Sequence, residues 1–277
     1  DSTYIKNYDI GTATLDLPHF FYKHRIDFLT FGDDVIKIPV GIACHTRSCL
    51  DESDTRFYGK NLFGITPGMK LTVQKKIVFP EEGSSLKPAL VEADGSITEF
   101  YGSYPDYIAA DRSGRRLRVS TTDGTMTVSA QDQTVEYYNA NGDITSIRHF
   151  TSREESTEIA RFAYDDLHHL TYAIGYLYMV NLYCSYDSTG QLATVEVQSD
   201  AFMGTAWKAT VSYVYDSVIF TLPNNVQYHY SFHNGSLTLG SLTTDENGTG
   251  FIEFLDCSQT KEEIHIKKTV GSRTVED

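Results

Sequence analysis

The sequence predicts an all-β protein built from twisted antiparallel hairpins, and three observations lead to this class. Turn dipeptides recur along the chain, the short runs beside them alternate apolar and polar residues, and a tyrosine-led motif repeats in the C-terminal part. Asn-Gly and Asp-Gly supply the positive φ angles that type I′ hairpin turns require. The dipeptides are Asp94-Gly95, Asp123-Gly124, Asn141-Gly142, Asn234-Gly235 and Asn247-Gly248.

The composition excludes several other classes. With 20 glycines, 7 prolines and 22% charged residues, the chain is neither disordered nor collagenous. A chain of 277 residues buries enough surface to form a core without a disulfide framework or a structural metal. The 37 acidic residues outnumber the 23 basic ones, which argues against a nucleic-acid partner and against an anionic membrane surface.

Neither the first residues nor the most apolar stretch predicts a membrane segment. The chain starts at Asp1 without the basic and apolar regions of a secretion signal, so we expect a processed, cytosolic or excised chain. Residues 170–184 are the most apolar stretch, but Gly175 and Asn181 interrupt it and it is too short to span a bilayer as a helix. No membrane span is expected.

We expect two parts, an irregular β lead-in over residues 1–103 and a hairpin array over residues 104–277. In the lead-in, Met69, Leu71 and Val73 alternate as in a strand. At the start of the array, two alternating pairs flank Asp123-Gly124 and predict a hairpin. These pairs are Leu117 with Val119, and Met126 with Val128.

The repeated motif begins with an aromatic residue. Asp or Asn follows it, Gly stands four positions after it and Leu or Ile six positions after it. Clear copies start at Tyr138, Tyr164 and Tyr186, a degenerate copy at Tyr215 and a shortened one at Phe232, so the period is loose. His168 replaces the glycine in the second copy, and the glycines of the other copies are Gly142, Gly190 and Gly235.

Each position of the motif has a physical reason. The aromatic residue ends a strand with its ring on the buried face, the Asp or Asn accepts backbone hydrogen bonds that open the turn, and Gly adopts a left-handed conformation. Residues two and four positions before the aromatic repeat the buried face in every copy but the first, where Thr134 and Glu136 stand. These residues are Ala160 and Phe162, Leu182 and Cys184, Val211 and Tyr213, and Tyr228 and Tyr230.

The motif Tyr186-Asp187-Ser188-Thr189-Gly190-Gln191-Leu192 resembles the YD repeat of bacterial RHS proteins, which teneurins share. Residues 64–71 are similar to the lead-in that precedes such repeats, with Met69 where tryptophan is usual, and residues 94–100 are similar to the hairpin that follows. This resemblance implies a β-sheet that spirals into a shell, as non-catalytic scaffold on secreted or surface proteins. The core signature and toxin domain that follow in that family are absent from this sequence.

Residues 152–163 permit two interpretations. Ser152 and Glu155 form a capping-box pattern that suits a helix. The phase of the repeat instead predicts a strand over at least residues 159–164, and we follow the repeat.

Three groups of polar residues invite a functional interpretation. His229 and His233 share a strand face and His168-His169 lies in a repeat turn, but no third metal ligand stands nearby. The acidic residues Asp33-Asp34 and 51–54 lack the spacing of a calcium loop, so we expect solvated loops. We expect unremarkable thiols at Cys44, Cys49, Cys184 and Cys257, with a Cys44–Cys49 disulfide still open if the protein is secreted.

The aromatic residues have a structural and a functional interpretation. Tyrosines at strand spacing usually pack in the core or across strands. On one exposed face, they would form a platform for sugar rings or a peptide, with Trp207, Tyr176, Tyr178 and Tyr183 as candidate members.

The sequence therefore favours a non-enzymatic scaffold or binding segment of a larger secreted or cell-surface bacterial protein. We expect no catalytic residue, no metal and no cofactor, and an unknown protein or glycan as partner. The alternative is a carbohydrate-binding or carbohydrate-active β-domain with an acidic, aromatic-lined cleft. Sequence motifs of nucleophilic or metal hydrolases are absent.

Overall fold

The computed structural model shows an all-β protein, as predicted. It describes residues 4–7, 11–16, 21–32, 37–45, 51–176, 180–198, 207–223, 227–233, 236–244, 250–259, 264–270 and 273–276, and no helix occurs among them. The strands in these ranges are β1 (Tyr4–Asn7), β2 (Gly11–Asp16), β3 (Phe21–Gly32), β4 (Lys37–His45), β5 (Met69–Leu71), β6 (Lys76–Val78), β7 (Ala89–Val91), β8 (Ile97–Ser103), β9 (Asp106–Ala109), β10 (Arg116–Val119), β11 (Met126–Ser129), β12 (Thr134–Tyr138), β13 (Ile144–Phe150), β14 (Ser156–Tyr164), β15 (Leu170–Gly175), β16 (Val180–Tyr186), β17 (Leu192–Gln198), β18 (Trp207–Val214), β19 (Ser217–Thr221), β20 (Gln227–His233), β21 (Ser236–Thr244), β22 (Gly250–Gln259), β23 (Ile264–Val270) and β24 (Arg273–Glu276).

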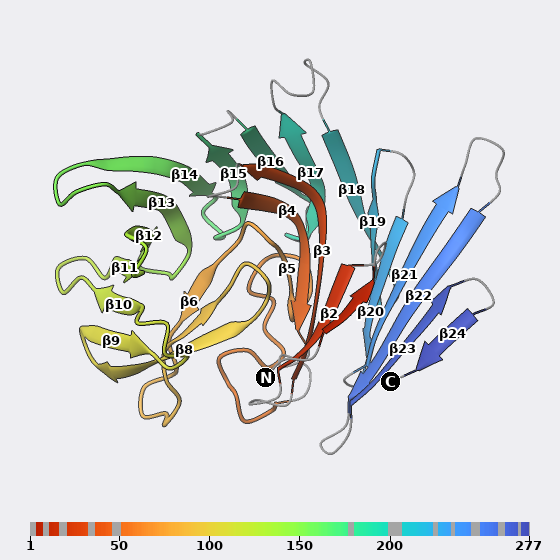
Figure 1. Ribbon diagram of the computed structural model, residues 1–277, viewed down its shortest axis with the longest axis horizontal. Coiled ribbons are helices and arrows are strands. Elements are labelled where there is room, and N and C mark those ends of the chain that lie inside the picture. Colours follow the sequence, from red (N-terminus) through yellow and green to blue (C-terminus); the bar gives the residue numbers. More distant parts are fainter. Residues whose placement is uncertain are drawn as a thin grey trace.

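The strands form two antiparallel sheets. Strands β1 to β5 make the first sheet, and each pairs with the next along the chain. Strands β6 to β24 make the second, again with sequential antiparallel pairing. A sheet of this size twists and curves because each strand is rotated relative to its neighbour. The second sheet accordingly sweeps around the molecule (Figure 1).

The first part of the second sheet closes into a ring. Strand β6 meets the start of β13, where Lys76 and Asp143 form a β-bridge. The Ile77 amide donates to the Gly142 carbonyl at 2.8 Å, and the Ile144 amide donates to the Lys75 carbonyl. Strands β6 to β13 therefore surround an interior, and β14 to β24 continue the sheet beyond the ring.

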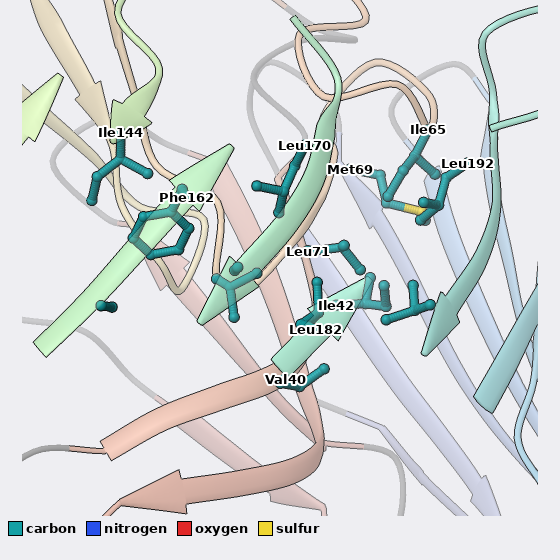
Figure 2. Packing of buried hydrophobic residues seen from close by; sticks show 14 of the residues in the cluster. Val40, Ile42, Ile65, Met69, Leu71, Ile144, Phe162, Leu170, Leu182 and Leu192 are labelled. Atoms are coloured by element: carbon teal, nitrogen blue, oxygen red, sulfur yellow. The ribbon is translucent and has the colours of Figure 1, made fainter. Parts of the chain in front are cut away.

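The first sheet lies within the curve of the second (Figure 1). Phe28 of β3 contacts three aromatic rings of β18, β19 and β20, at ring-centroid distances of 6.1 Å to Trp207, 6.1 Å to Phe220 and 5.3 Å to Tyr228. Figure 2 shows Val40, Ile42 and Leu71 from this sheet beside apolar side chains of the repeats. One continuous core thus joins the two sheets.

A second apolar cluster covers the outer face of the ring. Strand β7 is buried on both sides, because Leu90 points into the ring and its neighbours point outward. The loop segment 51–68, which contains no regular strand, packs on this outer face. Its residues Phe57 and Phe63 contact Ala89 and Val91.

The structure confirms two local predictions. The Asp123-Gly124 hairpin joins β10 to β11, with Leu117 opposite Val128 and Val119 opposite Met126, all four buried. Residues 156–164 form strand β14 and not a helix. The Ser152 hydroxyl accepts from the Glu155 amide at 3.1 Å, so the capping-box residues close a hairpin turn instead.

The prediction of type I′ turns is wrong for three of the five dipeptides. Gly95, Gly124 and Gly142 have φ between 74° and 83°, but the Asp or Asn before each one does not have a positive φ. A type I′ turn needs positive φ at both residues. The other two dipeptides, at 234–235 and 247–248, lie outside the described residues.

The predicted division of the chain at residue 103 stays a prediction. Residue 103 lies within the hairpin of β8 and β9.

Among the described residues, no helix has the length and apolar character needed to cross a membrane.

Candidate functional site

The three clear motif copies fold into the same turn. In each, the tyrosine pairs with the residue six positions later, and a β-bulge shifts the register just before the tyrosine. The residue four positions after the tyrosine has a positive φ in all three, including the non-glycine His168 at 64°. The pairs are Tyr138 with Ile144, Tyr164 with Leu170, and Tyr186 with Leu192.

The Asp or Asn after each tyrosine organises its turn through hydrogen bonds. One side-chain oxygen accepts from the backbone amides two and four positions later, as expected for residues that compete with regular backbone pairing. The turn is therefore held by a side chain that the motif specifies. The bonds to Asn139 come from Asn141 (3.0 Å) and Asp143 (3.0 Å), those to Asp165 from Leu167 (3.0 Å) and His169 (2.8 Å), and those to Asp187 from Thr189 (2.8 Å) and Gln191 (3.1 Å).

Two tyrosine hydroxyls each tie a repeat to the one before it. Tyr186 donates to the carbonyl of Leu170 at 3.0 Å, and Tyr213 donates to the carbonyl of Leu192 at 3.1 Å. Leu170 and Leu192 are the last motif positions of the preceding copies. Burial raises the pKa of both tyrosines, because it disfavours the ionised phenolate.

The expectation that the Tyr215 ring anchors its repeat in the core is wrong, and the nearby Tyr213 has this role. Tyr215 has a positive φ of 53°, and its ring is fully exposed in the turn between β18 and β19. Tyr213 instead packs against the core and makes the inter-repeat hydrogen bond. The turn in this copy also differs from the three clear ones, because Tyr213 pairs with Val218, five positions later, and Val214 pairs with Ser217.

The remaining anchors lie as follows. Tyr138 is buried, and Tyr164 and Tyr186 pack against the core. Phe232 belongs to strand β20, where it is paired with Leu237, while Gly235 lies outside the described residues. The residues two and four positions before the aromatic, which were expected on the buried face, are all buried or packed against the core. They are Ala160, Phe162, Leu182, Cys184, Val211, Tyr213, Tyr228 and Tyr230.

A network of buried charges explains why the first copy breaks this rule. Glu136 points into the ring, where it accepts from Lys75 Nζ and from the Tyr138 hydroxyl, both at 2.6 Å. Lys75 also pairs with Glu92 at 2.9 Å, and Arg115 pairs with Glu92. Glu136 can therefore occupy a position that faces the interior, because the positive charge of Lys75, which lies outside the motif, neutralises it.

This network keeps Glu92 and Lys75 charged. Burial by itself would raise the pKa of Glu92, but Lys75 and Arg115 together lower it below its ordinary value. Burial would likewise lower the pKa of Lys75, whereas Glu136 and Glu92 raise it. The network thus keeps both groups ionised. A carboxylate held this way suits ion pairing better than proton donation.

A second buried ion pair corrects the expectation of a solvated acid at Asp54, whereas Glu52 of the same loop is exposed as expected. Asp54 is buried and receives two hydrogen bonds of 2.8 Å from the Arg56 guanidinium. Arg56 also pairs with Glu99 of β8 at 2.7 Å. These bonds attach the loop to the outer face of the ring. The pair Asp33-Asp34 lies outside the described residues.

Lys70 is a fully buried cation that the sequence analysis missed. It lies in β5 between Met69 and Leu71, and all three residues are buried. Its Nζ donates to the carbonyls of Leu71 at 2.8 Å and Ala93 at 3.1 Å and lies 5.7 Å from the centre of the Phe63 ring. Burial lowers the pKa of Lys70 to about 7.

The lead-in contacts the third repeat turn directly. The Leu192 amide donates to the Gly64 carbonyl at 2.7 Å. A Cβ at Gly64 would lie 2.8 Å from the Tyr186 ring, and Gly64 has a φ of 75°, so only glycine fits there. His169 stacks against the Tyr186 ring, with centroids 4.4 Å apart, and a Cβ at Gly64 would also lie 3.2 Å from its ring.

The predicted aromatic platform does not assemble as one surface. Glu196 pairs with both Tyr183 and Lys208, whereas Val197 pairs with Leu182 and Trp207. Because side chains alternate across a sheet, Tyr183 and Trp207 point to opposite faces. Trp207 packs against the core, and Tyr183 lies 40% exposed on the outer face.

The other two platform candidates add no shared surface. Tyr176 is half-buried just after β15, and its amide donates to the Ile159 carbonyl at 2.9 Å. Tyr178 lies outside the described residues. Tyr183 instead contacts Tyr172 on the neighbouring strand, with centroids 5.2 Å apart.

The described residues contain no cluster of three or more metal-ligating side chains. The Nδ1 atom of His168 lies 3.4 Å from a carboxylate oxygen of Asp143, and that of His169 lies 3.2 Å from one of Asp165. The His229 ring forms a hydrogen bond with the Gln227 side chain. Cys44 and Cys184 lie in strands β4 and β16, and burial raises the pKa of the Cys184 thiol. Cys49, the suggested disulfide partner of Cys44, lies outside the described residues.

The fold and the turns together define an all-β, repeat-like array of strands. Comparison of the sequence with protein-family models and with curated proteins found no match in either case.

Proposed function

We propose that this chain is a non-enzymatic scaffold segment of a larger bacterial protein of the RHS or YD-repeat type, secreted or held at the cell surface. The observation that carries the proposal is the same Asx-stabilised turn in three copies, with tyrosine hydroxyls joining consecutive repeats. Such a unit cannot bury its aromatic face alone and must stack on neighbours. A rigid surface is the property that this construction provides.

The buried charges support the same role. Each cation described in the ring network and at Arg56 has carboxylate partners, and these pairs join segments far apart in the sequence. Paired charges of this kind specify which segments meet. The pairs Lys75–Glu136 and Arg115–Glu92 join the expected lead-in to the hairpin array. Arg56–Glu99 attaches the loop segment 51–68 within the lead-in.

Protease treatment of intact cells that produce the native protein tests the location. If the protein is at the surface, added protease should remove the signal of an antibody raised against the folded chain, while a cytoplasmic marker survives. If the protein is secreted, the signal should appear in the culture medium. Complete protection until the cells are lysed would contradict the proposal.

The alternative of a carbohydrate-binding β-domain receives no support from the aromatic residues, since Tyr183 and Trp207 lie on opposite faces. A glycan-array screen of the purified chain separates the two roles. The scaffold role predicts no saturable binding. Binding that is lost on Tyr183→Ala, with the fold intact by circular dichroism, would favour the alternative.

A further inference from the structure

The hairpin of β8 and β9 and the strand after it carry a surface that combines exposed arginines with exposed apolar side chains. Residues 101–119 contain four arginines and two aspartates, whereas the whole chain has a net charge of -14. Large apolar side chains are exposed in the same stretch. We name this surface the hairpin patch and define it as Tyr101, Tyr104, Ile108, Arg112, Arg116 and Arg118.

The strand register places the central members of the patch side by side. Tyr101 of β8 pairs with Ile108 of β9, which pairs with Arg116 of β10. In the next outward row, Arg118 lies opposite Asp106. Neighbouring strands lie about 4.8 Å apart. The three side chains therefore form a continuous row across the outer face.

The apolar members of the patch are well exposed. Tyr101, Tyr104 and Ile108 are 51%, 59% and 53% exposed, while Phe100 and Ala109 point to the other face and are buried. Single exposed apolar residues are ordinary on protein surfaces, but contiguous ones mark interaction sites.

The arginines of the patch are available to a partner. Within the described part of the chain, Arg112 and Arg116 are exposed and form no ion pair. Arg118 lies 3.6 Å from Asp106, and both side chains are more than two-thirds exposed. Such a pair contributes little to stability and is readily exchanged.

The patch continues a surface that already binds polypeptide. The loop segment 51–68 covers the outer face of β6 to β8 with Phe57 and Phe63. The loop reaches as far as Glu99 of β8, which pairs with Arg56. Tyr101 is the next residue of β8 that points outward, and it is exposed.

We propose that the hairpin patch docks an acidic polypeptide segment of another protein, one that also carries apolar or aromatic side chains. Tyrosine and arginine are enriched at protein interfaces, and an aliphatic residue, Ile108, lies at the centre of the row. The exposed arginines complement acidic side chains and exclude basic partners. This inference goes beyond the scaffold role and does not depend on where the protein is located.

Fluorescence anisotropy with the full chain and labelled synthetic polymers tests the proposal. A random copolymer of glutamate and tyrosine should bind, with an affinity that falls as salt is added. Poly-glutamate should bind at least about tenfold more weakly, because it lacks the apolar contacts. Alginate, an anionic polysaccharide, should bind no better than poly-glutamate.

Variants locate the binding on the patch. The double variant Tyr101→Ser and Ile108→Thr should weaken copolymer binding at least about tenfold, and Arg116→Gln should weaken it and flatten its salt dependence. Arg153→Gln and Val214→Thr remove a matched exposed arginine and a matched exposed aliphatic residue elsewhere and should leave binding unchanged. Circular dichroism checks that each variant is folded.

Three results would overturn the inference. The first is an absence of copolymer binding at low salt. The second is equal binding by the patch variants and the control variants. The third is alginate binding as tight as that of the copolymer, which would assign the surface to anionic polymers in general.

Discussion

Lys70 shows how a single residue can make stability depend on pH. In the folded protein, burial lowers the pKa of Lys70 from 10.5 to about 7. Between these two values the unfolded chain binds a proton that the folded protein does not, so folding becomes more favourable as pH rises. Below pH 7 both states carry the proton, and the folded state bears the cost of a buried charge.

We therefore predict that Lys70→Met removes this pH dependence. The wild-type free energy of unfolding should gain on the order of 2 kcal/mol from Lys70 between pH 7 and pH 9. The variant should lose that gain, whatever its absolute stability, because methionine does not titrate. Urea denaturation at several pH values measures it. The exposed Lys60→Met is the matched control, and an unchanged slope in Lys70→Met would contradict the prediction.

At the scale of the repeat element, the tyrosine hydroxyl is what distinguishes Tyr213 from Tyr215. We predict that Tyr213→Phe and Tyr186→Phe each lower stability by about 1 kcal/mol, since each removes one hydrogen bond to a buried carbonyl. Tyr215→Phe should have no effect, because that ring is fully exposed. The denaturant midpoints of the three variants test this prediction. A larger loss of stability in Tyr215→Phe than in Tyr213→Phe would support Tyr215 as the anchor, as the sequence motif suggested.

Gly142 closes the ring, and this makes it different from other turn glycines. A Cβ there would lie 1.9 Å from the Ile77 carbonyl oxygen, and the φ of 83° resists any side chain. We predict that Gly142→Ala lowers stability by about 3 kcal/mol, through strain and through a weakened contact between β6 and β13.

Gly124→Ala provides the control for ring closure. Gly124 also has a positive φ, of 74°, but its Cβ would meet nothing closer than Ala140 at 3.4 Å. The substitution should cost only about 1 kcal/mol from the backbone conformation. Equal losses in thermal or urea denaturation would mean that the ring contact adds nothing.

At the scale of the whole molecule, stability depends on how the first sheet sits in the curve of the second. Phe28 connects them through Trp207, Phe220 and Tyr228. We predict that Phe28→Ala costs about 3 kcal/mol and increases hydrogen exchange in β3 and in β18 to β20 together. Exchange measured by mass spectrometry checks this, and an increase confined to β3 would show that the sheets are not coupled there.

Local patterns predicted the parts that depend on neighbours in sequence. The hairpin around Asp123-Gly124, the strand over residues 156–164 and the Asx-stabilised turns follow from residues a few positions apart. The type I′ prediction was wrong because a type I′ turn joins two strands through two residues, whereas these loops are longer: the bonded pairs that enclose them are Glu92 with Ser96, Ser120 with Thr125, and Asn139 with Asp143. The anchor at Tyr215 was wrong because Tyr213, and not Tyr215, reaches the previous repeat.

The sequence by itself determined the all-β class and the repeated turn, since alternation, turn residues and the spacing of the motif are local properties. Only the tertiary structure decided that Lys70 and Glu136 lie inside, that Tyr183 and Trp207 face opposite ways, and that Tyr101, Ile108 and Arg116 meet in one row. Burial and adjacency across strands depend on segments distant in the chain. No pattern within a single strand records which neighbour will cover it.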